Sequence, residues 1–123
     1  MAKVLGLGGL FFKSPDPAAL RAWYAKWLGV EGDEYGTMFA AAKMPKDGVT
    51  VWSPFASDTA YFDPSPENYM FNLIVDDLDG ALAQVREGGA TVVGKIEEFD
   101  YGRFGWFVDP DGRKVELWQP PTG

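Results

Sequence analysis

The chain of 123 residues contains neither cysteine nor histidine. Without cysteine no disulfide framework can form, which is typical of cytoplasmic proteins, whose thiols stay reduced. Without histidine the commonest general base is missing, and the lack of both residue types removes the nitrogen and sulfur ligands that zinc prefers. The sequence therefore favours a cytoplasmic protein and argues against a zinc site.

The chain also has little positive charge and no long apolar run. Its 11 Lys and Arg face 18 Asp and Glu, which gives a formal net charge of −7. Nucleic-acid binding needs a basic footprint, and a membrane helix needs about 18 consecutive apolar residues. The apolar stretch from Lys3 to Phe12 ends at Lys13 without a small-residue cleavage site, so it favours a core strand over a signal peptide. We expect neither a nucleic acid nor a membrane as a partner.

The first half of the chain predicts a strand, a helix and three further strands. A strand is expected over residues 4–13, and Asp16 and Pro17 then suit the N-cap and first turn of a helix. Apolar residues follow at the spacing of an amphipathic helix, namely Leu20, Trp23, Tyr24, Trp27 and Leu28. Gly29 suits a left-handed helix end. Further strands are expected near residues 37–43, 48–53 and 59–63.

The same order of elements begins again after Pro64-Ser65-Pro66. A strand over residues 69–75 leads into Asp76-Asp77, a helix N-cap signal. Helical spacing returns at Leu78, Ala81, Leu82 and Val85. Strands are then expected near residues 91–96, 104–108 and 114–118.

This repeat predicts an α+β fold class with two βαβββ modules in a single domain. Module 1 would span about residues 1–63, a linker residues 64–67, and module 2 about residues 68–120. Each module alone leaves a curved mixed sheet with one face covered by its helix and the other face bare. Two bare faces turned toward each other would enclose a cleft.

The last hairpin places one carboxylate between two apolar residues. Asp109-Pro110-Asp111-Gly112 is a tight-turn sequence. Since neighbours on a strand point to opposite faces, Glu116 faces away from the core if Val115 and Leu117 face it. Strand parity likewise turns Phe11 and Asn72 toward the bare face, unless a bulge shifts the register.

Three passages resemble the glyoxalase / bleomycin-resistance / extradiol-dioxygenase superfamily, also called vicinal oxygen chelate proteins. They are residues 11–29, with Tyr24 followed by Leu28-Gly29; residues 72–79; and residues 107–118, with the Asp109-Pro110-Asp111-Gly112 turn followed by Glu116-Leu117. The resemblance covers almost the whole chain. It implies a small single-domain member with two βαβββ modules, a homodimer, and a site in the cleft between the modules.

The resemblance also bears on metal binding. In metal-dependent relatives the ligands come from the first and last strands of each module, and Glu116 matches the last of these positions. Gly9 and Met70 fall at the first-strand positions, and residues 59–61 near the remaining one. Glycine has no side-chain donor, a thioether is a poor ligand for hard divalent metals, and an iron site of two histidines and one carboxylate is impossible here. We therefore expect no metal and no cofactor.

The candidate site centres on Glu116, for which two interpretations stay open. It either lies in an aromatic cavity, as a general base or the partner of a cationic ligand, or it is an exposed strand residue paired with Lys114 or Arg103. Arg103 could itself bind a substrate carboxylate, or be a solvated surface residue. Asn72 would supply one hydrogen bond among apolar walls. The aromatic candidates, which line the cleft or simply pack, are Phe11, Trp52, Tyr61, Trp106 and Trp118.

Three functions are compatible with this site. The leading hypothesis is a glyoxalase-like protein that binds a small molecule of unassigned identity; if it is an enzyme, the resemblance implies a lactoylglutathione-lyase-like lyase or isomerase. The alternative is a drug-sequestering, bleomycin-resistance-like binding protein without catalysis. It would need only an acidic, aromatic cleft that stacks on a planar cation. A third hypothesis is a structural or regulatory protein with a vestigial cleft.

Overall fold

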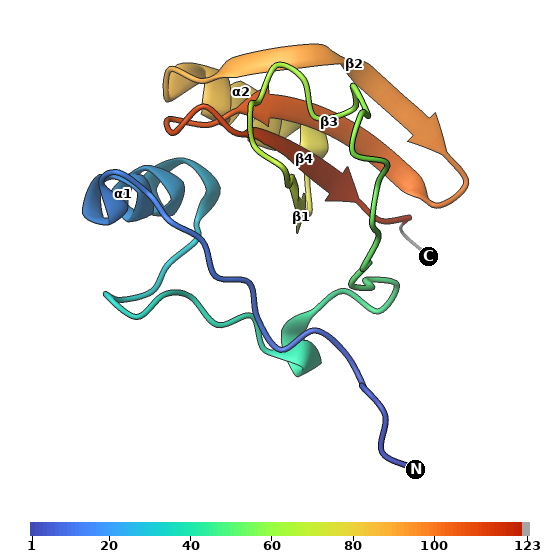
Figure 1. The fold of residues 1–123 in the computed structure, drawn as a ribbon. Coiled ribbons are helices and arrows are strands. Elements are labelled where there is room, and N and C mark those ends of the chain that lie inside the picture. Colours follow the sequence, from blue (N-terminus) through green and yellow to red (C-terminus); the bar gives the residue numbers. More distant parts are fainter. Residues whose placement is uncertain (122–123) are drawn as a thin grey trace.

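The computed structural model describes residues 1–121 of the chain, which form two α-helices and one four-stranded sheet (Figure 1). In chain order the elements are α1 (Pro17–Leu28), the short 3-10 helix η1 (Ala41–Lys43), β1 (Phe71–Ile74), α2 (Leu78–Glu87), β2 (Thr91–Phe99), β3 (Gly102–Val108) and β4 (Lys114–Gln119). The predicted α+β class is confirmed. No helix within residues 1–121 has the length and apolar character needed to cross a membrane.

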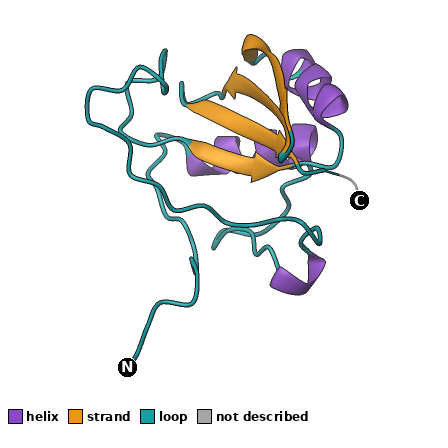
Figure 2. Ribbon diagram, turned by 90° about the vertical axis from the view of Figure 1, so that its right-hand side faces the viewer, coloured by secondary structure: helices purple, strands orange, loops and turns teal. Residues whose placement is uncertain are grey.

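The second half of the chain forms a complete βαβββ unit. Its strands are ordered β1-β4-β3-β2, with β1 parallel to β4 and the other neighbours antiparallel. Figure 2 shows the sheet as a curved and unclosed layer. The helices cover one face, which we call the helix face. The opposite face, which we call the open face, carries Asn72, Ile74, Phe104, Trp106, Glu116 and Trp118, as the strand register requires.

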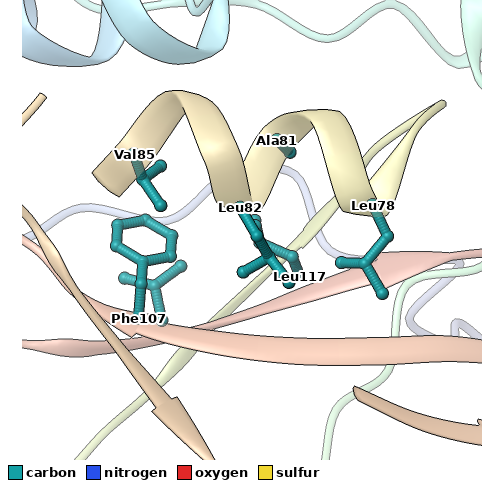
Figure 3. Packing of buried hydrophobic residues seen from close by; sticks show 7 residues of the cluster. Leu78, Ala81, Leu82, Val85, Phe107 and Leu117 are labelled. Atoms are coloured by element: carbon teal, nitrogen blue, oxygen red, sulfur yellow. The ribbon is translucent and has the colours of Figure 1, made fainter. Parts of the chain in front are cut away.

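The hydrophobic core lies between α2 and the helix face of the sheet (Figure 3). Asp77 caps α2, since its side chain accepts a hydrogen bond from the Gly80 N–H. The helix then buries one apolar stripe against inward-facing strand residues. The cluster consists of Leu78, Ala81, Leu82, Val85, Phe107, Val115 and Leu117.

The helix α1 packs beside the C-terminal end of α2. Asp16 caps it by accepting a hydrogen bond from the Ala19 N–H, and Gly29 ends it with φ of 66°. The Trp23 indole Nε1 donates to the Gly88 carbonyl over 2.8 Å, and its ring stacks on Phe107 with 5.9 Å between centroids. Both predicted helices are thus confirmed, with their predicted capping residues.

The prediction of four strands in the first half of the chain is wrong. Within residues 1–70, the segments 4–13, 48–53 and 59–63 form no sheet ladder, and residues 37–43 contain η1 in place of a strand. Their side chains are largely exposed, for example Leu5 at 90%, Phe11 at 94% and Trp52 at 80%. Apolar and β-branched residues in alternation show only that a segment would suit a half-buried strand. A strand also needs a neighbouring strand to pair with, which these segments lack here. The predicted boundaries of the two modules stay a prediction.

The turn between β3 and β4, residues 109–113, which we call the closing turn, binds the first half of the chain to the sheet. Asp109 accepts hydrogen bonds from the backbone N–H groups of Asp111 and Arg113, and from the Tyr24 hydroxyl of α1 over 2.9 Å. Arg113, which is 4% exposed, donates to the Tyr69 hydroxyl, to Asp111 and to the Lys13 carbonyl. One buried polar turn therefore holds both α1 and the N-terminal segment.

The hydrogen bond from Tyr24 to Asp109 makes the stability of the fold decrease with pH in the alkaline range. Burial, followed by the negative charge of Asp109 and the hydrogen bond to it, raises the pKa of Tyr24 above its usual value near 10. The unfolded chain then loses the Tyr24 proton above about pH 10 while the folded chain keeps it, so this contribution is complete below that pH and declines above it. We expect Tyr24 alone to lower the free energy of unfolding by about 1.4 kcal/mol per pH unit above pH 10.

Urea unfolding between about pH 8 and pH 11 measures this dependence. Tyr24→Phe is the matched variant, because it keeps the ring packing and removes the proton. It should be less stable at neutral pH, since it lacks the hydrogen bond to Asp109, and its stability should fall less steeply with pH. Equal slopes for both proteins would contradict the role of Tyr24.

Candidate functional site

Glu116 lies at the centre of a row of side chains across the open face. In the strand register it is the direct partner of Asn72 on β1 and of Trp106 on β3, and Val93 on β2 extends the row. Register partners on one face have side chains within about 5 Å of each other. Alternation along three uninterrupted strands therefore brings an amide, a carboxylate and an indole side by side.

The Glu116 carboxylate accepts three hydrogen bonds from neutral donors. Asn72 Nδ2 donates to Oε1 over 2.6 Å, while the Tyr61 hydroxyl and Trp106 Nε1 donate to Oε2 over 2.6 and 2.9 Å. We call these four residues the Glu116 cluster. Glu116 and Trp106 are buried, whereas Asn72 and Tyr61 are exposed. The carboxylate is thus held in a fixed position just beneath the surface of the open face.

Tyr61 brings the first half of the chain to this cluster. Its ring meets Trp106 edge to face at 6.4 Å and stacks on Phe55 at 5.6 Å. The Lys114 ammonium donates to the Tyr61 carbonyl over 2.7 Å and lies 5.0 Å from the ring centroid. Burial, then the hydrogen bond to Glu116 and the charge of that carboxylate, raise the pKa of Tyr61. At neutral pH its hydroxyl is therefore a hydrogen-bond donor.

A second row of aromatic rings lies next to the Glu116 cluster. Phe104 and Trp118 are register partners whose rings stack at 6.2 Å, and Trp118 Nε1 donates to the Tyr101 carbonyl over 2.8 Å. The exposed rings of Phe99 and Tyr101 stack on each other at 5.1 Å and meet Phe104 edge to face. Sequence reasoning missed Phe99, Tyr101 and Phe104, although the parity of Phe104 with Trp106 was a usable signal.

The structure brings four of the sequence candidates together and leaves three apart. Glu116, Tyr61, Asn72 and Trp106 are in direct contact, with Trp118 in the adjacent row. Phe11 is exposed, beside a cavity of about 300 Å³ between the N-terminal segment and β1, and Trp52 is exposed.

Arg103 lies on the other side of the sheet. Its parity on β3 matches that of Phe107, which faces α2. Its guanidinium pairs with Asp79 of α2 at 2.9 Å and with Glu98 of β2 at 3.0 Å. The structure therefore does not place Arg103 against Glu116, and the same parity could have been read from the sequence.

The residues at this site do not fit a divalent metal. Both Glu116 oxygens already face hydrogen-bond donors, and an amide or hydroxyl proton directed at an oxygen competes with a cation. The β1 residue that faces Glu116 is Asn72, a neutral amide, whereas Met70, which the resemblance puts at the first-strand ligand position, precedes the strand. Among residues 1–121, no three His, Cys, Asp or Glu side chains are grouped as metal ligands would be. The cluster is a hydrogen-bonded acceptor site.

A family model matches most of the chain. A family model described as a glyoxalase-like domain matches residues 9–118. A search of curated proteins found no match.

Solved structures resemble the chain to different extents. One from the mobile metagenome of V. Pseudocholerae is 19% identical over 99% of each chain with a TM-score of 0.61, which shows a shared fold. A member of the glyoxalase/bleomycin resistance protein/dioxygenase superfamily from Sphaerobacter thermophilus is 34% identical with a TM-score of 0.36, and the match spans only 40% of either chain. The antibiotic binding protein TnmS3 from Streptomyces sp. is 23% identical over 86% of this chain and 88% of that chain, with a TM-score of 0.49.

Proposed function

Because the chain belongs to the glyoxalase-like domain family, we propose that it binds a planar aromatic small molecule on its open face without a metal or other cofactor. The observation that carries the proposal is the Glu116 cluster, a buried carboxylate fixed by three neutral donors beside stacked aromatic rings. A few placed polar groups among aromatic walls are typical of small-molecule sites.

Binding without turnover is favoured over catalysis by the state of the carboxylate. A general base takes the proton from its partner, whereas a hydrogen-bond acceptor leaves the proton on the donor. Both Glu116 oxygens accept hydrogen bonds from side chains of the protein, two of them at 2.6 Å. We therefore propose sequestration of a ligand, with Glu116 as a hydrogen-bond acceptor, in preference to lyase or isomerase activity.

We further propose that the protein acts as a homodimer in the cytoplasm. Large apolar side chains of the first half are exposed, and unpaired segments of strand-like pattern tend to pair with another chain. The edge strand β1 offers such a segment of a second copy a free side, since within residues 1–121 β1 pairs only with β4. The absence of cysteine agrees with a cytoplasmic location.

Light scattering coupled to size exclusion tests the homodimer directly. The expected particle has twice the chain mass of 13.5 kDa. A monomer at concentrations well above those used for binding would contradict the dimer, and would leave the ligand site of the single chain to be judged by the binding experiment.

Tryptophan fluorescence tests the binding function, since Trp106 belongs to the cluster and Trp118 lies in the next row. We expect saturable quenching by at least one of two planar probes, cationic proflavine or neutral 2-naphthol. Glu116→Gln should weaken that binding about tenfold, because it removes the charge that strengthens the hydrogen bond to the ligand. The matched control is Glu98→Gln, which changes an exposed carboxylate paired with Arg103.

Two outcomes would overturn this function. The first is the absence of saturable quenching by either probe. The second is conversion of the methylglyoxal–glutathione hemithioacetal that appears on addition of nickel or zinc and is lost on chelation, which would make the protein a metal-dependent enzyme.

A further inference from the structure

We infer that Tyr61 occupies the place of the ligand, and that the ligand class of this site is a neutral, electron-rich hydroxyarene whose O–H group replaces the Tyr61 hydroxyl at Glu116. This inference rests on the proposed function and names the chemistry of the molecule bound. Its evidence is the surroundings of the Tyr61 side chain, which combine an acceptor, two aromatic contacts and a cation.

The acceptor end of this place selects a hydroxyl donor. The phenol oxygen of Tyr61 lies 2.6 Å from Glu116 Oε2, the short distance of an O–H donor bound to a carboxylate. Trp106 Nε1 shares the same oxygen from 2.9 Å and fixes its position. A methyl ether in this place would have no proton to donate and would leave the carboxylate oxygen facing an ether oxygen.

The ring of Tyr61 is held by contacts that any flat aromatic ring can make. It stacks on Phe55 with 29° between the planes, and meets Trp106 at 84°. These are the offset-stacked and edge-to-face geometries that aromatic pairs prefer. An external arene that enters between Phe55 and Trp106 would therefore keep the same two contacts.

Lys114 selects against a cationic ligand. Its ammonium lies 5.0 Å from the centroid of the Tyr61 ring and 5.7 Å from that of Trp106. A cation over a ring face is attracted by an electron-rich ring and repels a positively charged one. The net charge of −7 favours cations at long range, but the charge at the site itself favours a neutral hydroxyarene.

Tyr61 can leave this place because a ligand ring would replace its ring contacts and because it does not belong to a helix or strand. It lies in a turn outside any helix or strand, and its side chain is 39% exposed. Its side chain makes one hydrogen bond, to Glu116. A ligand that donates to the same oxygen replaces this bond one for one, so the displacement leaves the carboxylate satisfied.

Calorimetric titration with 2-naphthol and 2-methoxynaphthalene tests the inference, because the two probes differ only in the donor proton. The wild-type protein should bind 2-naphthol about tenfold more tightly, which is the usual effect of a hydrogen bond to a charged group. Tyr61→Phe keeps the ring but removes the hydroxyl that competes for Glu116, and should raise the affinity for 2-naphthol about tenfold further. The same variant should raise the affinity for 2-methoxynaphthalene by a similar factor, because either ligand displaces the side chain at position 61 and phenylalanine has no hydrogen bond to lose. The control Tyr35→Phe, which alters an exposed tyrosine, should leave both affinities nearly unchanged.

The same titration of Glu116→Gln is the second test. This variant should reduce the preference for 2-naphthol over 2-methoxynaphthalene several-fold. Equal affinities of the wild-type protein for the two naphthalenes, or a Tyr61→Phe variant that binds 2-naphthol no better, would overturn the inference. Saturable binding of proflavine alone would overturn it while leaving the proposed binding function in place. If neither the wild-type protein nor Tyr61→Phe binds any of the three probes, both the inference and the proposed binding function are overturned.

Discussion

Replacing Glu116 with alanine is expected to lower the free energy of unfolding by about 3 kcal/mol and to abolish ligand binding. The substitution removes the common acceptor of three donors. Tyr61 and Asn72 are exposed, so water can satisfy their donors. The Trp106 indole N–H is buried and would be left without its acceptor, so it carries most of the expected loss.

Glu116→Gln is the matched variant for this prediction. A glutamine keeps one acceptor oxygen for Tyr61 and Trp106, and its amide N–H₂ can donate to Asn72 if the Asn72 amide turns over. We therefore expect Glu116→Gln to cost only about 1 kcal/mol of stability, through the loss of charge alone. Urea unfolding curves of the three proteins measure the difference. A Glu116→Ala variant as stable as Glu116→Gln would contradict the role of the carboxylate as a shared acceptor.

The second large effect is expected at Arg113. Its side chain is 5% exposed, and that of Asp109 beside it is fully buried, with 3.6 Å between Nη1 and Oδ2. Arg113→Met would keep much of the packing but leave Asp109 as a buried charge without its cation, and the Lys13 carbonyl without its donor. Removing one partner of a buried ion pair typically costs about 3–5 kcal/mol. We expect a loss of that size.

Arg103→Met is the control, because Arg103 also pairs with two carboxylates but at the surface. Its partners Asp79 and Glu98 have side chains 66% and 69% exposed. Exposed pairs of this kind contribute little to stability, because solvent screens them. Thermal unfolding should therefore separate the two variants clearly, and equal stability of Arg113→Met and Arg103→Met would refute the anchoring role of the closing turn.

Local patterns in the sequence predicted both helices and the strands of the second half well. The caps at Asp16 and Asp77, the helical spacing and the Asp109 turn depend on neighbouring residues, so the sequence contains their full signal. The bulge of β2 between Val93 and Glu97 was missed, and Gly94 with φ of 72° was its signal. Since β3 and β4 pair without a bulge, the parity that turns Glu116 away from the core was not disturbed.

The rest depends on contacts that no local pattern contains. The hydrogen bond from Tyr61 to Glu116 joins residues 55 positions apart, and only the folded chain brings them together. The first-half strands were predicted from composition and alternation, yet a strand needs a partner that propensity cannot supply. Arg103 differs, because its alternation with Phe107 already indicated the helix face.

The closing turn also has a consequence for the order of folding during synthesis. Tyr24 is tied to Asp109 across 85 positions, and Lys13 to Arg113 across 100. Contacts between residues so far apart in the sequence form late in folding, because a long loop must close before they stabilise the fold. At about 5–20 residues per second, the ribosome needs roughly 5–20 s to add the stretch between Lys13 and its anchor. The N-terminal segment and α1 therefore cannot dock on the closing turn until residues 109–113 have been synthesised.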